Sequence, residues 1–344
     1  MRQQLPTALI AFVMFVTTVA AATAVIWAQG APLQASGPVD PIPRIVEAFR
    51  THNVVALNDP HGNRQVQAFI LSLIRDPRFP DFVDDIVLES ASSRYQGAID
   101  RFVRGDDVPP ALLRKAWEDH TAANSLSSQA AELIEAVRAV NGSLRGTRKL
   151  RVIAGDPPVD WENISSTEDH WRWIELRDSY PADLIRRQVV ERERRALVLY
   201  GQGHLQRRQV ASNYDMSTWQ AQTVVSLLER DAAVRVFNIW TWLDPEVDLK
   251  ESASWPVPSL LVLRGTILGQ RDFESYARGL LGGARFAVKD GQLVALPRDQ
   301  WRTLRMDEQF DALLYLGLPS AMTFIDAPRA RCSDQQFVTE RLRR

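Results

Sequence analysis

Short apolar segments rich in β-branched residues alternate with longer amphipathic segments from residue 41 onward, and this alternation constrains the fold more than any other feature. It predicts an α/β protein with a mainly parallel sheet flanked by helices on both faces. Helices are expected over 65–75 and 130–140, where apolar residues recur on one face. Strands are expected over 53–57, 85–88, 150–154, 196–200, 234–239, 260–263 and 312–316.

The chain shows no internal repeat, so residues 45–330 are expected to form one continuous domain. A flexible linker is predicted before it, at 29–44, and a polar tail after it, at 331–344. The glycine-containing stretch 252–297 is interpreted as either an antiparallel edge or a small appended unit. Lys289-Asp290-Gly291 predicts a hairpin turn within it.

The N-terminus carries an uncharged apolar run, from Ala8 to Ala28. Roughly 20 such residues suit either a cleaved signal peptide or an anchor that spans a bilayer. Residues 1–28 therefore predict either export, to the periplasm or the cell exterior, or attachment to a membrane through this segment alone.

The charge balance argues against nucleic acid as a partner, and the cysteine content excludes an internal disulfide and a zinc ion shared by two thiols. The 41 Lys and Arg balance 42 Asp and Glu, so no net field attracts nucleic acid, and the expected partner is a small-molecule or peptide ligand. The single cysteine, Cys332, has no second thiol for an internal disulfide or a shared zinc ion.

Ionisable residues follow three of the expected strands. Asp59 and His61 follow 53–57, Glu89 follows 85–88, and His204 follows 196–200 after two glycines. Carboxyl ends of parallel strands line a common crevice, so these four side chains are predicted to form one site. Each motif alone would also suit an ordinary turn, but three of them together favour a site.

Two further residues are expected to bind substrate. Asp156 follows the strand 150–154. Its position before two prolines also suits a plain turn. Arg177 begins a helical stretch and could either neutralise an anionic substrate or orient a carboxylate.

The order of these motifs resembles a superfamily that unites the ChaN-like haem-uptake proteins, the erythromycin esterases and the Tiki and TraB-type proteins. The resemblance is carried by Asn58-Asp59-Pro60-His61, by Leu88-Glu89 and by Gly201-Gln202-Gly203-His204. It covers roughly residues 45–210, and the segment from Tyr95 to Gly105 looks most like the ChaN branch.

The resemblance implies haem binding in one branch, ester hydrolysis in another and metal-dependent peptidase activity in a third. Such variety means that the fold alone does not decide the function. The chain departs from the usual Gly-Glu of the first motif, which is Asn58-Asp59 here. A carboxylate shorter by about one methylene can misplace a catalytic group.

The residue types favour a hydrolase acting on an ester or peptide-like bond. His61 would be the general base on water, Asp59 or Glu89 would orient it, and His204 would stabilise or protonate the leaving group. Alternatively, His61, Glu89 and His204 would hold a divalent metal that activates the water.

Two other functions remain open at this point. One is binding of haem or another ligand in an apolar groove, lined by some of the ten tryptophans, such as Trp171, Trp173, Trp240 and Trp242. Aromatic residues at these positions are also typical of an ordinary core. The other is an inactive interaction module, since Asp59 replaces the usual Glu.

We predict that residues 1–28 are dispensable for folding, because they form an uncharged run before a Pro- and Gly-containing stretch. A chain that starts after residue 28 should match the thermal unfolding of the full chain. Mass spectrometry of the mature protein then separates the two expectations. A new N-terminus near residue 28 indicates cleavage, and an intact one in the membrane fraction indicates an anchor.

Overall fold

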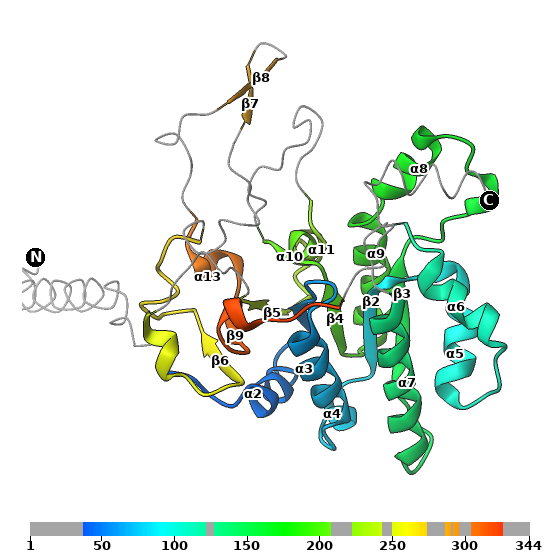
Figure 1. Ribbon diagram of the computed structural model, residues 1–344, viewed down its shortest axis with the longest axis horizontal. Coiled ribbons are helices and arrows are strands. Elements are labelled where there is room, and N and C mark those ends of the chain that lie inside the picture. The colour runs from blue at the N-terminus through cyan, green and yellow to red at the C-terminus, as the bar shows by residue number, and fades with distance from the viewer. Residues whose placement is uncertain are drawn as a thin grey trace, which may run out of the picture.

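The computed structural model describes residues 37–121, 127–207, 222–242, 250–273, 286–289, 292–295 and 304–325. Its main body is a seven-stranded sheet with the strand order β3-β2-β4-β1-β5-β9-β6 (Figure 1). The strands are β1 (Val54–Asn58), β2 (Asp85–Ser92), β3 (Arg151–Asp156), β4 (Ala196–Tyr200), β5 (Val236–Thr241), β6 (Ser259–Val262) and β9 (Ala312–Tyr315).

The predicted α/β class is confirmed, and each of the seven expected strands is present. All neighbouring pairs are parallel except β6 and β9, which are antiparallel at one edge. β2 continues to Ser92, beyond its expected end at Leu88, because its pairing with β3 shifts register there and resumes at Ser92. Such an irregularity lets a strand continue while it turns a side chain in a new direction.

Helices cover both faces of the sheet, as predicted. The expected helix over 65–75 is α3, which starts one residue earlier, and the one over 130–140 is the longer α7. The helices are α2 (Pro41–Ala48), α3 (Arg64–Arg75), α4 (Phe79–Phe82), α5 (Gln96–Arg104), α6 (Pro110–Glu118), α7 (Ser127–Ser143), α8 (Thr167–Ile174), α9 (Ser179–Gln188), α10 (Gln202–Leu205), α11 (Val224–Leu228) and α13 (Met306–Gln309).

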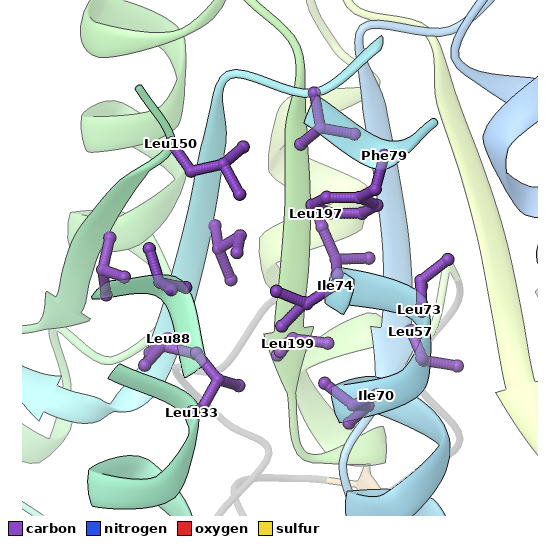
Figure 2. Packing of buried hydrophobic residues seen from close by; sticks show 14 of the residues in the cluster. Leu57, Ile70, Leu73, Ile74, Phe79, Leu88, Leu133, Leu150, Leu197 and Leu199 are labelled. Carbon is purple, nitrogen blue, oxygen red and sulfur yellow. The ribbon is translucent and has the colours of Figure 1, made fainter. Parts of the chain in front are cut away.

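The strands send alternate side chains into two cores. In β1, Val55 and Leu57 join the cluster under α3 and α7, whereas Val54 and Ala56 join the cluster under α9 and α11. Figure 2 shows the first cluster, in which Ile70 and Leu73 of α3 lie against the leucines of the sheet. Every residue of β1 is buried, as is typical of a central parallel strand.

The predicted linker over 29–44 is wrong for its last residues. Val39 pairs with Leu260 at the edge of β6, and α2 begins at Pro41. The Asp40 carboxylate accepts the backbone N–H of Ile42, and proline suits the first turn of a helix. This sequence therefore starts a helix, although its prolines and small residues resemble a linker. Residues 29–36 lie outside the described residues.

The second, two-stranded sheet bears out an antiparallel addition near the C-terminus. β7 (Phe286–Lys289) and β8 (Gln292–Ala295) pair in antiparallel fashion, as the predicted hairpin requires. The turn residues Asp290 and Gly291 lie outside the described residues, as do the apolar run 8–28 and the expected tail 331–344. Within the described part of the chain, no helix is long and apolar enough to cross a membrane.

Candidate functional site

Three neighbouring strands of the sheet are aligned at the site. Leu57 of β1 and Leu88 of β2 both lie in register with Leu199 of the strand between them, β4. β1 and β4 end one residue later, beside the point where β2 loses its regular pairing with β3. The backbone N–H of Asp59 still bonds to the carbonyl oxygen of Tyr200, at 2.8 Å, and this fixes the start of the His61 turn.

Glu89 lies at the centre of the predicted site and is 6% exposed. Its Oε1 accepts a hydrogen bond from Nη2 of Arg177, and its Oε2 accepts the backbone N–H of Gly201 at 2.5 Å. Both histidines approach the same carboxylate. Nε2 of His61 lies 3.5 Å from Oε2, and Nε2 of His204 lies 3.4 Å from Oε1. The structure thus brings the predicted residues together.

The glycine at the end of β4 allows this close approach. A Cβ atom at Gly201 would lie 3.3 Å from Oε2 of Glu89 and 3.4 Å from Nε2 of His61. Any larger residue would therefore press on both side chains. A glycine in such a loop lets the backbone come close to charged groups.

Asp178 orients His204 and was not among the predicted site residues. Its Oδ1 accepts a hydrogen bond from Nδ1–H of His204 at 2.8 Å and another from the backbone N–H of Val224 at 3.0 Å. His204 therefore lies between two carboxylates, one at each ring nitrogen. The available signal was the position of Asp178 next to Arg177, ahead of α9, but nothing local in the sequence pairs it with His204.

Asp59 lies beside His61 at the outer side of the site. Its Oδ2 is 3.9 Å from Nδ1 of His61, and its buried Oδ1 has no hydrogen-bond partner among the described residues. A structural alternative would make Asp59 the cap of α3. That cap is instead Asn63, whose Oδ1 accepts the backbone N–H of Val66 at 2.9 Å. Asp59 therefore keeps an acceptor oxygen available to the site.

The carboxylates determine the charge of both histidines. Burial opposes protonation of His61, but Glu89 and Asp59 outweigh it and raise its pKa to about 10. Burial likewise opposes protonation of His204, and Asp178 and Glu89 raise its pKa to about 9. Burial favours the neutral form of Glu89, yet the two histidines hold its pKa well below its usual value. At pH 7 the site therefore contains a carboxylate between two imidazolium rings.

This charge distribution changes the chemistry expected of His61. A general base must start without its proton, and the raised pKa of His61 keeps the ring protonated near neutral pH. Both rings can donate a proton or stabilise negative charge. The carboxylate with a free oxygen, Asp59, is the group that can accept a proton.

The two predicted substrate-binding residues act mainly within the protein. Arg177 orients a carboxylate, one of its two expected roles, since it donates to Glu89. Asp156 accepts the backbone N–H of Thr121 at 2.8 Å and its hydroxyl at 2.5 Å, so both oxygens are engaged. Burial raises the pKa of Asp156 to about 7, although Arg177 and Thr121 oppose the shift.

As they lie, His61, Glu89 and His204 do not fit a metal ion. Both oxygens of Glu89 already accept donors, and a cation there would compete with the Arg177 guanidinium. Within the described ranges, no group of three or more His, Cys, Asp or Glu side chains is placed to hold a metal ion.

The tryptophan pair at the end of β5, Trp240 and Trp242, does not line a haem groove. Trp240 stacks on Phe310 with ring centroids 5.9 Å apart, and Trp242 stacks on Tyr315 at 6.0 Å. Both are buried in the core, as the structural interpretation of these positions expected. On α8, Trp171 is exposed and Trp173 is half-buried.

Comparison with known proteins identifies the fold. No protein-family model matches the chain, and no curated protein matches it. Among solved structures, a succinoglycan biosynthesis protein matches with a TM-score of 0.50 and 11% identity, over 82% of this chain and 94% of its own. A protein from Bacillus cereus matches with a TM-score of 0.46 and 12% identity, over 83% of this chain and 94% of its own.

ChaN of Campylobacter jejuni, whose structure contains cofacially bound haem, is also among the matches. Its TM-score is 0.36 and its identity 13%, over 64% of this chain and 96% of its own. Identities this low concern the fold alone and leave the activity open.

We predict that the stability of the protein falls as the pH rises from 7 to 10. Each histidine has a folded-state pKa above its ordinary value of 6.5, so its contribution is complete below about pH 6.5 and is lost as the pH passes 9 and 10. The loss amounts to at most about 1.4 kcal/mol per pH unit for each histidine. Denaturant unfolding of the wild type and of the His61→Gln/His204→Gln variant measures it.

The double variant should show a clearly flatter dependence than the wild type over this range. His52→Gln is the matched control, because Nδ1 of His52 bonds to the carbonyl oxygen of Ala48 at 3.0 Å rather than to a carboxylate. Parallel curves for wild type and double variant would mean that the two histidines are not held protonated by the site.

Proposed function

We propose that the protein is an exported hydrolase of an ester or peptide-like bond, with Asp59, His61, Glu89 and His204 as its acid–base centre. The observation that carries the proposal is the sharing of one buried carboxylate by two imidazoles, beside a second carboxylate with a free oxygen. Paired donors and an acceptor at the ends of parallel strands suit addition of water to a carbonyl group. The proposal of export is supported by the uncharged run 8–28.

In this mechanism Asp59 is the base. Its carboxylate, on a side chain that is 18% exposed, takes a proton from water, while the water oxygen forms a bond to the carbonyl carbon of the substrate. The developing oxyanion is stabilised by the imidazolium of His61. His204 then donates its Nε2 proton to the leaving oxygen or nitrogen as the carbonyl–leaving-group bond breaks.

Glu89 and Asp178 keep the two imidazoles charged and oriented. Glu89 lies against both Nε2 atoms, and Asp178 holds Nδ1 of His204. After the leaving group departs, Asp59 gives its proton to solvent water and His204 takes a proton from solvent at Nε2, so both groups return to their starting states.

We predict that Glu89→Gln abolishes hydrolysis across a panel of ester and peptide substrates. Without the carboxylate both imidazoles lose their shared anion, and the expected loss is at least about a hundredfold in rate. Arg50→Gln is the control, because Arg50 pairs with Glu47 on the exposed surface. Thermal unfolding identifies any variant that fails to fold.

The same purified protein tests the main alternative. An absorption band in the haem Soret region, together with no turnover of any substrate by the wild type, would favour haem binding instead. Turnover that is equal in the wild type and the Glu89→Gln variant would contradict the assignment of this site.

We further predict that Asp59→Asn costs at least about a hundredfold in rate, the scale for losing a positioned acid or base. An amide cannot take the proton from water. Asp59→Glu should be far milder, because it keeps the carboxylate and restores the length usual in the superfamily that the motifs resemble. Steady-state kinetics of the two variants and the wild type measure the contrast.

The stability of the two variants separates catalysis from structure. Asn63, rather than Asp59, caps α3, so Asp59→Asn keeps the cap of this helix, and thermal unfolding shows that the variant is folded under the conditions of the assay. An Asn variant with full activity would refute the role of Asp59 as the base.

A further inference from the structure

The turn that carries His61 is held by residues far away in the sequence. Gly62 has the left-handed backbone conformation, with φ of 89°, and connects His61 to the capping residue Asn63. Such a turn of a few residues needs partners for its backbone groups. These partners come from α7 and from the segment 323–325, which follows β9.

Gln129 of α7 holds the turn from one side. Its Oε1 accepts the backbone N–H of Gly62 at 2.6 Å, and its Nε2 donates to the carbonyl oxygen of Asn63 at 3.3 Å. Gln129 is 5% exposed, so little water competes for either bond. One side-chain amide thus bonds to the backbone at both ends of the dipeptide Gly62-Asn63, which follows His61.

The segment 323–325 holds the turn from the other side. The backbone N–H of Ile325 donates to the carbonyl oxygen of Gly62 at 2.8 Å, and the carbonyl oxygen of Thr323 accepts the N–H of Arg64 at 2.9 Å. The side chain of Gln65 adds three bonds to Thr323, at 3.0, 3.1 and 3.3 Å. Phe324 forms a β-bridge with Asn63 between these contacts.

We propose that Gln129 and the segment 323–325 form a clamp that positions His61 against Glu89. His61 lies only two residues from the clamped Asn63. Its contacts with Glu89 and Asp59, at 3.5 and 3.9 Å, are too long to hold the ring in place by themselves. Gln129 is therefore a positioning residue, and it does not touch the reacting atoms. The clamp itself is independent of the proposed function. Only its value for catalysis, through the placement of His61, rests on that function.

The test measures how readily His61 leaves Glu89, and it needs no substrate. Diethyl pyrocarbonate acylates the unprotonated nitrogen of an accessible imidazole. A His61 ring that leaves its carboxylates loses its proton more readily and reacts faster, and mass spectrometry of the peptides gives the rate at each histidine. In Gln129→Leu, His61 should react at least about fivefold faster, the factor expected from losing one hydrogen bond of ordinary strength. His204, which is held by Asp178, should keep its rate and serves as the internal reference.

Gln67→Leu is the matched control. Gln67 is also a 5% exposed glutamine between α3 and α7, but its Nε2 bonds to Gln129 O and to Glu132, and not to the turn. It should lower stability without changing the His61 rate. Equal rates at His61 in both folded variants, or an equal rise at His61 and His204, would overturn the clamp.

A milder variant keeps the proposal testable if Gln129→Leu does not fold. Gln65→Ala removes the three side-chain bonds to Thr323 on a half-exposed surface, and should raise the His61 rate at least about twofold. If the His61 rate is unchanged in this variant, the proposal is overturned. A protein without hydrolase activity that still shows these rate changes would contradict the proposed function and leave the clamp intact.

Discussion

The buried carboxylate of Glu89 is the group on which the rest of the site depends. A buried anion is costly unless charges and hydrogen-bond donors surround it. Here these are the guanidinium of Arg177, the backbone N–H of Gly201 and the two imidazoles. Each of them comes from a different part of the chain. A structure that satisfies Glu89 has therefore already brought the two imidazoles together.

The sheet order makes this arrangement possible. β4 lies between β1 and β2, so the ends of strands that carry His61, Gly201 and Glu89 are immediate neighbours. The register aligns Leu57, Leu88 and Leu199 across the three strands, and their buried side chains pack in one core cluster that fixes this alignment. The apolar core thus sets the height at which the charged groups meet, and the irregularity in β2 after Leu88 directs Glu89 toward them.

The fold and the convergence of four site residues could be predicted because both follow from local patterns. Buried strands read as apolar runs, and the ends of parallel strands always meet at one edge. The charge of His61 could not be predicted, because its pKa depends on distances to Glu89 and Asp59. Asp178 was missed for a similar reason. Its partner lies on another element, and only the folded chain brings the two together.

The bond between Ile325 and Gly62 has a consequence for the making of the protein. All the ionisable groups of the site are synthesised by residue 204, yet the turn of His61 receives its last partners only when the chain has passed β9. Contacts between residues so distant in sequence form late in folding. A nascent chain therefore carries the ionisable side chains of the site for some time before the turn of His61 is fixed. The turn of His61 is completed only after synthesis has passed residue 325.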